Sequence, residues 1–371
     1  MTHTHPLLRP GLWLLVGYLA ISFGFYFQVS RVQPGAADFF TPWLGARARL
    51  VEGLNPYSEA VTIRSQRSIL GREAGPDEDQ LAFAYPLTAV ILLAPFAVLA
   101  YPVAQAFWVS GLMLAACVLS RAWVRPRLGP LALAGLFLWT IFFYPLARGL
   151  ILGQIAVAVA LLFSLAAVLL LRPASPSTRQ QIVAGVALAF TLVKPQLMFL
   201  AVPLLLWRAW RMRQRHAVIA FAATGLLLFV TSTLLQPGWL ADWLHQLSRY
   251  AQYVDRVPLI RNAVPDPWLS LAATVALLLA VLLAGWRRLQ APSERFEATL
   301  WLSMVVTLLI TPRSTVSDQS ILALPMLALI DAHPRRGLLL AGALAVGLWL
   351  LFFATLSTRG ESPLIRAPVP V

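Results

Sequence analysis

The sequence predicts an all-α membrane protein with many spans, folded as a single domain over residues 1–371. Of these residues, 59% are hydrophobic and only 12% are charged, whereas soluble domains carry about 25% charged residues. The mean hydropathy is +0.74. Four stretches lack Asp, Glu, Lys and Arg altogether: residues 80–120, 128–147, 149–171 and 267–286. Each is long enough for at least one helix of roughly 20 residues to cross the hydrocarbon core.

Eleven apolar segments are expected to form the helices, which gives about 11 transmembrane spans. The count is approximate, because a segment interrupted by proline can form one span or two. The first segment lacks a small-residue cleavage site and is therefore expected to stay as the first helix. In chain order the segments are residues 12–27, 85–99, 103–119, 131–144, 151–171, 182–207, 217–235, 268–286, 298–310, 319–330 and 338–355.

Two long polar segments interrupt this pattern. Residues 30–84 hold seven of the fifteen acidic residues, and residues 236–266 are rich in aromatic side chains, among them Trp239, Trp243 and Tyr250. Because Trp and Tyr favour the membrane–water boundary, both segments are expected to lie along one membrane surface. We interpret them as the first and second extracytoplasmic loops.

The net charge of +14 comes almost entirely from arginine, since 28 of the 29 basic residues are Arg, and dense groups of these arginines lie in short loops between apolar runs. No basic stripe alternates with aromatic residues, so a nucleic-acid partner is not expected. The pattern instead fits the positive-inside rule and predicts a multi-pass protein of the bacterial inner membrane, with both polar segments facing the periplasm or cell exterior. The arginines of residues 208–215, 287–288 and 335–336 are placed in the cytoplasm.

The arginines of residues 121–127 and 172–179 leave two arrangements open. They lie in the cytoplasm if residues 182–207 form a hairpin that turns at Lys194-Pro195 and residues 85–99 re-enter or are offset. They lie outside if residues 182–207 form one long kinked helix.

Lys194 is the only lysine of the chain, and it lies between apolar stretches in Phe190-Thr-Leu-Val-Lys-Pro-Gln196. An ionisable residue at membrane depth indicates a functional site. Pro195 removes a backbone donor, and Gln196 adds a polar side chain at the same level. We expect a broken helix that lines a polar cavity, in which the ammonium group suits a phosphate. The alternative is a lysine that extends to the membrane surface from a short hairpin.

Other polar residues are weaker candidates when each is taken alone. Asp38 follows the first helix and could act as a general base, or it could cap a helix. Gln154 enters an apolar helix and needs a hydrogen-bond partner. Arg313 and Asp318 share a polar loop and could pair with each other. Cys117 is the only cysteine, and the five histidines lack the spacing of metal ligands, so no metal or other cofactor is expected.

Several short motifs occur in an order that resembles glycosyltransferase family 87, whose characterised members are similar to polyprenol-phosphate-mannose-dependent α-mannosyltransferases. Asp38 precedes the motifs, and the resemblance covers nearly the whole chain. The motifs are Gly53-Leu-Asn-Pro-Tyr57, Phe83-Ala-Tyr-Pro86, Leu152-Gly-Gln154, Ala184-Gly185 and Val193-Lys-Pro-Gln196. The stretch Ser314-Thr-Val-Ser-Asp-Gln319 departs from related sequences, because it lacks Trp and His.

The resemblance implies a bundle of the GT-C type with its active site beneath the first extracytoplasmic loop. It also implies a sugar donor on a polyprenyl phosphate, with mannose or arabinose as the sugar and mannose the favoured one. The acceptor would be a lipid or glycan, and membrane lipids would surround the protein. Transfer would be an inverting single displacement with Asp38 as the catalytic base. The residues expected to bind the donor phosphate are Lys194, Gln196, Arg148 and Arg313. Those expected to contact substrate are Tyr57, Asn55, Tyr85, Gln154 and Asp318.

Two other functions fit parts of the sequence. A transporter or flippase for a lipid-linked or anionic solute would also place a broken helix and a charge near the membrane midplane. It is less favoured because the two halves of the chain show no clear correspondence. A non-catalytic assembly or anchor protein would leave the lone buried lysine without a purpose.

Overall fold

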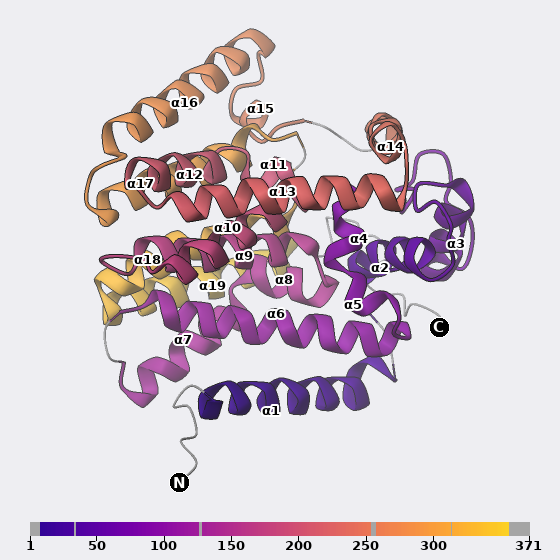
Figure 1. Ribbon diagram of the computed structural model, residues 1–371, viewed down its shortest axis with the longest axis horizontal. Coiled ribbons are helices and arrows are strands. Elements are labelled where there is room, and N and C mark those ends of the chain that lie inside the picture. Colours follow the sequence, from indigo (N-terminus) through magenta and orange to yellow (C-terminus); the bar gives the residue numbers. More distant parts are fainter. Residues whose placement is uncertain (1–7, 33–34, 126–127, 254–256, 313, 356–371) are drawn as a thin grey trace.

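The computed structural model describes residues 8–32, 35–125, 128–253, 257–312 and 314–355, and in these ranges the fold is all-helical without strands (Figure 1). Most of the long helices lie side by side and nearly parallel. The helices of the first half are α1 (Leu8–Phe25), α2 (Ala37–Leu50), α3 (Glu59–Leu70), α4 (Thr88–Leu92), α5 (Ala94–Ala97), α6 (Tyr101–Trp123), α7 (Pro130–Phe142), α8 (Tyr144–Leu152) and α9 (Ile155–Leu171).

The second half continues in the same bundle. Its helices are α10 (Thr178–Phe190), α11 (Pro195–Met198), α12 (Ala201–Arg211), α13 (Arg215–Leu235), α14 (Trp239–Tyr253), α15 (Ile260–Ala263), α16 (Pro267–Arg288), α17 (Ser293–Ile310), α18 (Ala323–Ala332) and α19 (Pro334–Thr355). A π-helical turn, η1 (Tyr26–Ser30), extends α1, and two 3-10 turns, η2 (Thr191–Val193) and η3 (Val316–Leu322), interrupt the bundle.

Within the described residues, five helices are long and apolar enough to cross a membrane, and the pair α7 and α8, bent by 58°, makes a sixth if it forms one span. The five are Gly11–Ser30, Tyr101–Trp123, Arg215–Leu235, Pro267–Arg288 and Pro334–Ala354. The expected count of about 11 spans is not confirmed. Several of the predicted helices are broken into pieces of 4 to 13 residues, which by themselves are too short for a span.

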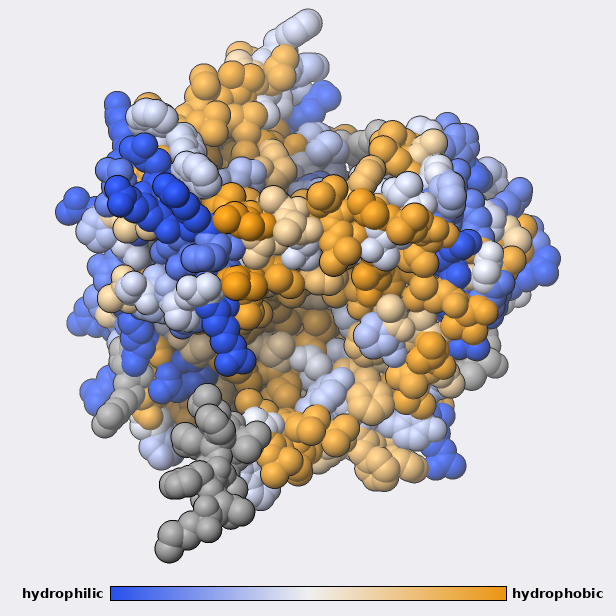
Figure 2. Space-filling view, in the orientation of Figure 1, coloured by the Kyte–Doolittle hydropathy of each residue, from blue (hydrophilic) through white to orange (hydrophobic). Residues whose placement is uncertain are grey.

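The surface is that of a multi-pass membrane protein. Figure 2 shows an apolar belt over the middle of the molecule, with hydrophilic residues gathered at its left and right edges. The belt includes exposed apolar side chains of α13 such as Leu226 and Leu234. We call the edge formed by α2, α3 and α14 the loop end, and the opposite edge the arginine end.

Residues 182–207 form the hairpin that the arginine pattern allowed. A Cβ on Gly185 of α10 would meet the Ala217 carbonyl at the start of α13, and further along, Leu192 approaches Gly225. Helices α10 and α13 therefore run parallel. Since α12 leads directly into α13, it must run back, and the chain turns near Lys194 (Figure 1). The arrangement with one long kinked helix is wrong.

Residues 85–99 are offset rather than spanning. Helices α4 and α5 have five and four residues, and both pack against α2 at the loop end. Trp43 Nε1 donates to the Phe96 carbonyl at 3.0 Å, and Tyr101 Oη, at the start of α6, donates to the Ala36 carbonyl at 2.8 Å. The chain therefore enters and leaves this segment on the same side.

With these two features, the arginine-rich loops meet at one end of the bundle. Arg125 after α6 and Arg172 after α9 both pair with Asp331 of α18, at 3.1 and 3.0 Å. Arg208 of α12 donates to the Leu289 carbonyl after α16 at 2.8 Å. Arginines from both halves of the chain thus lie at the same end of the bundle.

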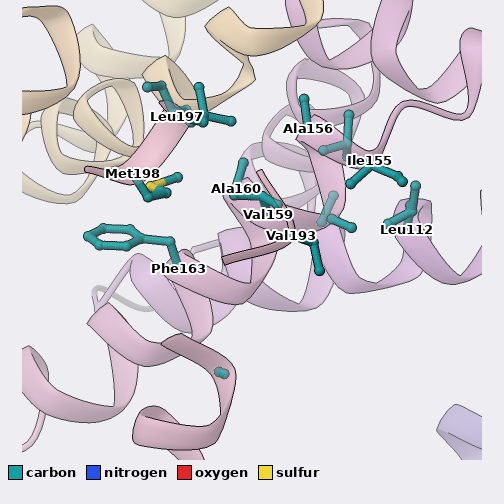
Figure 3. Packing of buried hydrophobic residues seen from close by; sticks show 14 of the residues in the cluster. Leu112, Ile155, Ala156, Val159, Ala160, Phe163, Val193, Leu197 and Met198 are labelled. Atoms are coloured by element: carbon teal, nitrogen blue, oxygen red, sulfur yellow. The ribbon is translucent and has the colours of Figure 1, made fainter. Parts of the chain in front are cut away.

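Helix α9 lies at the centre of the bundle, and its sequence explains why. Small residues alternate with branched ones from Ile155 to Ala160, and all six are buried. Figure 3 shows this stretch packed against Leu112 of α6 and Val193 of η2, with Phe163 further along the helix beside Met198. A helix that is apolar all round is buried, and small residues let neighbouring backbones approach closely.

Candidate active site

Three helix breaks meet near the loop end of the bundle. The first, Gly153-Gln154, separates α8 from α9. The second, Lys194-Pro195, separates η2 from α11. The third is η3, between α17 and α18. Helix α9 packs against both η2 and η3, and α8 also packs against η3. Breaks of this kind place polar groups inside an apolar bundle, as in membrane proteins that bind polar ligands at depth.

The Asp38 carboxylate reaches the first break from the polar loop of residues 30–84. Gln154 Nε2 donates a hydrogen bond to Asp38 Oδ2, so the two residues that were separate candidates in the sequence are partners. Asp38 lies in the first turn of α2. Tyr101 Oη fixes the start of this turn by donating to the Gly35 carbonyl at 2.6 Å as well as to that of Ala36.

Gly153 allows α2 to approach this closely. Its φ is +64°, and a Cβ would lie 2.6 Å from the Phe39 Cβ. The Gly153 carbonyl accepts a hydrogen bond from Trp108 Nε1 at 2.8 Å, and the Trp108 ring stacks on Phe39 at 5.1 Å. Only glycine combines this backbone conformation with this contact. It therefore sets the distance between Asp38 and Gln154.

Lys194 and Asp318 form a buried ion pair between the second and third breaks. Lys194 Nζ donates to Asp318 Oδ1, and the two residues are 9% and 5% exposed. Asp318 Oδ2 also accepts from the Thr315 N–H at 2.9 Å, which caps η3. The cation beside Asp318 is thus Lys194, whereas Arg313, the partner suggested by the sequence, lies outside the described residues. An ammonium group has three donors, so a pair with Asp318 leaves Lys194 able to hold an anion.

The charges around Asp38 tune its acidity. Burial raises the pKa of Asp38 above its ordinary value, and the hydrogen bond from Gln154 opposes the rise. The Asp79 carboxylate raises this pKa further, while Lys194 and Arg148 lower it. All these charges are therefore within electrostatic range of Asp38. A carboxylate with a raised pKa is a better proton acceptor near neutral pH.

Tyr85 lies among the same acidic groups. Burial raises the pKa of its hydroxyl, and Asp38, Tyr250, Asp318 and Asp79 add to the rise. Its backbone carbonyl accepts a hydrogen bond from the buried Tyr57 hydroxyl at 2.8 Å. In this structure Tyr57 therefore supports Tyr85.

The remaining sequence candidates lie further from Asp38 or have other partners. Asn55 Nδ2 donates to Asp242 of α14 at 3.0 Å, which ties the two polar loops together and confirms that they share one surface. Arg148 of α8 lies over the Phe352 ring, 5.3 Å from its centroid. The Gln196 side chain is exposed, and its backbone carbonyl accepts from the Thr311 hydroxyl at 3.4 Å.

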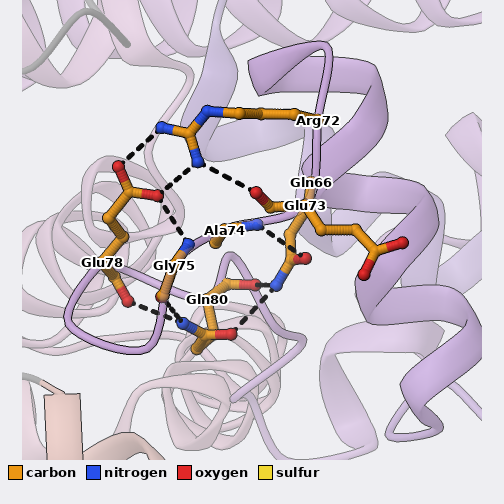
Figure 4. A network of polar contacts seen from close by, with 7 residues as sticks. All are labelled: Gln66, Arg72, Glu73, Ala74, Gly75, Glu78 and Gln80. Atoms are coloured by element: carbon orange, nitrogen blue, oxygen red, sulfur yellow. Dashed lines mark hydrogen bonds and ion pairs between the residues drawn. The ribbon is translucent and has the colours of Figure 1, made fainter.

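Nothing in the sequence marks Asp79 as a site residue, because Asp77-Glu-Asp79 looks like part of a loose loop. Figure 4 shows that a polar network orders this loop. Gln66 Nε2 donates to the Gln80 carbonyl at 2.9 Å, and Gln80 Nε2 donates to the Gly75 carbonyl at 2.7 Å. Asp79 Oδ1 accepts from the Leu81 N–H at 3.0 Å. Asp79 therefore has a fixed position at the site.

The described part of the chain holds no group of three or more His, Cys, Asp or Glu that could bind a metal ion. Metal-independent chemistry stays a prediction.

Residues 83–312 match the model of glycosyltransferase family 87. The match covers more than half of the chain and includes Tyr85, Gln154 and Lys194. Asp318 lies shortly after its end, whereas Asp38 lies well before its start. No curated protein and no solved structure matches the chain.

Proposed function

This chain is a member of glycosyltransferase family 87, and from that premise we propose that it transfers mannose from a polyprenyl phosphate to a lipid or glycan acceptor. The observation that carries the proposal is the Asp38–Gln154 pair beside the Lys194–Asp318 pair. It sets a proton acceptor next to a cation within an apolar bundle. As part of this proposal, we assign the helical bundle to the GT-C type.

Asp38 is the proposed general base. It removes the proton of an acceptor hydroxyl while the hydroxyl oxygen forms a bond to the anomeric carbon of the sugar. The bond between that carbon and the phosphate oxygen breaks, and the phosphate leaves with the electron pair. One carboxylate suffices, because a phosphate leaves without protonation, unlike the alkoxide released by a glycosidase. This single displacement inverts the anomeric carbon.

Lys194 is the proposed stabiliser of the leaving phosphate. Polyprenyl phosphate gains a negative charge as it departs, and a fixed cation in a site of low dielectric stabilises that charge. Asp318 holds the ammonium group in place. Arg148 is close enough to influence Asp38 and supplies a second positive charge, while Arg313 and Gln196 stay as proposed donor contacts.

The loop end is proposed to face the periplasm or cell exterior, and the arginine end the cytoplasm of a bacterium. The support is the gathering of Arg125, Arg172 and Arg208 at one end, as the positive-inside rule requires. A transporter has the weaker claim, since family membership supports a transferase.

The donor class is tested by sugar transfer in membranes that contain the full chain. Radiolabelled mannose is supplied either on a polyprenyl phosphate or as a nucleotide sugar, with polyprenyl-phosphate arabinose as a further donor. We expect transfer from polyprenyl-phosphate mannose, and none from the nucleotide sugar in membranes free of other transferases. Transfer from the nucleotide sugar alone would contradict the proposed donor.

A further inference from the structure

Helix α14, in the second polar loop, is attached to the first polar loop beside Tyr85. Trp243 Nε1 donates to the Ala84 carbonyl at 3.1 Å, next to Tyr85. Asp242 Oδ2 accepts from Asn55 at 3.0 Å and from Gln236 at 2.7 Å. Figure 1 shows α14 at the loop end, beside the region of α2 and α3. The helix is thus attached to the first loop at two successive residues.

The face of α14 that meets the first loop is aromatic. Its residues follow one another at intervals of three or four, the spacing of a single helix face: Trp239, Trp243, Gln246, Tyr250 and Tyr253. The Tyr250 and Tyr253 rings meet edge to face at 5.5 Å. On the opposite face, His245, Ser248 and Gln252 are exposed.

Asp79 is within electrostatic range of this aromatic face and of the proposed base. Burial raises the pKa of Tyr253, with Asp79 the first of the charges that add to the rise, and Asp79 also acts on Asp38. The backbone around Asp79 is fixed, because Leu81 has a φ of +51° and its N–H is held by the Asp79 carboxylate. Asp79 thus has a fixed backbone within electrostatic range of both the proposed base and Tyr253.

We propose that Asp79, Tyr250 and Tyr253 form the acceptor subsite, and that the acceptor presents a neutral sugar or other polyol ring there. Tyrosine combines a flat apolar ring with a polar tip, which suits a ring with one apolar face and hydroxyls at its edge. A carboxylate accepts hydrogen bonds from such hydroxyls. This inference rests on the proposed transferase function.

The distribution of charge separates the two substrates. Lys194 and Arg148 provide positive charge for the donor phosphate, whereas Asp79 and Asp38 make the acceptor side negative. An anionic group at the acceptor side would be repelled, which is a means of discriminating between partners.

The test measures two reactions of the same enzyme with radiolabelled polyprenyl-phosphate mannose. One is hydrolysis of the donor by water, which needs no acceptor subsite. The other is transfer to the octyl glycosides of mannose, glucose and galactose, with octan-1-ol as a probe that has a hydroxyl but no ring. The variants are Tyr250→Ala and Asp79→Asn. Gln252→Ala on the outer face of α14 and Asp77→Asn in the exposed loop are the matched controls.

Both variants should raise the KM for the octyl glycosides about tenfold, the equivalent of losing one good contact. Donor KM should change less than about twofold in both variants, which also shows that they are folded. Hydrolysis should change less than about twofold in Tyr250→Ala. In Asp79→Asn the hydrolysis rate is measured only as a reference for transfer at the same pH, because Asp79 also acts on the pKa of Asp38. Tyr250→Phe should keep most of the transfer, because the ring remains. The control variants should behave like the wild type, and octan-1-ol should be a poor acceptor.

An unchanged acceptor KM in both variants, or an equal loss of hydrolysis and transfer, would overturn the subsite. Hydrolysis by the wild type without transfer to any of the three glycosides would overturn it too. If the wild type releases no labelled mannose to water or to acceptor, the proposed function fails and the subsite fails with it.

Discussion

The Gln154 side chain donates a hydrogen bond to the Asp38 carboxylate across 116 positions of sequence. It joins the break between α8 and α9 to the first turn of α2. Because the bond lowers the pKa of Asp38 against the effect of burial, it both positions the proposed base and adjusts its acidity.

Removal of this bond should shift the pH dependence of transfer. In Gln154→Ala the pKa of Asp38 should rise, since the group that stabilised its charged form is gone. The acidic limb of the kcat/KM profile should therefore move to higher pH, and activity at neutral pH should fall about tenfold or more. Transfer rates measured across the pH range check this, with Gln252→Ala as the control. An acidic limb that stays in place would show that Gln154 does not act through Asp38.

Substitution of Gly153 should damage both stability and activity. In Gly153→Ala the new Cβ meets Phe39 at 2.6 Å in a backbone conformation that other residues rarely adopt. The expected cost is about 1–3 kcal/mol, together with displacement of Asp38 from Gln154. Gly135→Ala on α7 is the matched control, because nothing lies within 4 Å of its Cβ position. Thermal unfolding in detergent and transfer assays would reveal the difference, and equal behaviour of the two variants would contradict this role.

Substitutions in the Lys194–Asp318 pair should separate the contribution of Lys194 to stability from its contribution to donor binding. Lys194→Met leaves a buried Asp318 without its cation, at a cost of about 3–5 kcal/mol. The double variant Lys194→Met/Asp318→Asn should recover most of this stability but not the use of donor. Unfolding midpoints and donor KM values for the single and double variants test the point. If the double variant regained wild-type donor KM, Lys194 would have only a structural role.

Loss of the Asp38 charge should not harm the fold. The pKa of Asp38 is raised in the folded state, so its ionisation opposes folding increasingly as pH rises from the ordinary value of about 3.9 through the raised one. Asp38→Asn should therefore be as stable as the wild type at low pH and at least as stable at neutral pH. Unfolding temperatures at several pH values measure this, and a marked loss of stability at neutral pH would contradict it.

Much of the architecture could be predicted from the sequence, because membranes constrain it strongly. The lone lysine before Pro195 indicated a break, and the arginine pattern was consistent with a hairpin there, which the structure confirms. The number of spans could not be predicted, since the apolar runs of residues 85–99 and 319–330 give no sign that they form short packed segments. Their partners, such as Trp43 and α8, are distant in sequence.

It was harder to predict which residues lie together at the site than to identify each residue as a candidate. Asp38, Gln154, Lys194 and Asp318 each stood out by chemistry, but their pairing depends on contacts between distant breaks. Asp79 was missed because the hydrogen bonds of Gln66 and Gln80 that order its loop leave no pattern in the sequence.

Asp38 is proposed to be the catalytic base of a sugar transfer from a polyprenyl-phosphate donor. The most direct measurement compares the transfer of radiolabelled mannose from that donor in membranes that contain wild-type, Asp38→Asn or Asp77→Asn protein. Wild type and Asp77→Asn should transfer the sugar, whereas Asp38→Asn should bind the donor but transfer at least about 100-fold more slowly. Full activity of Asp38→Asn would contradict the claim.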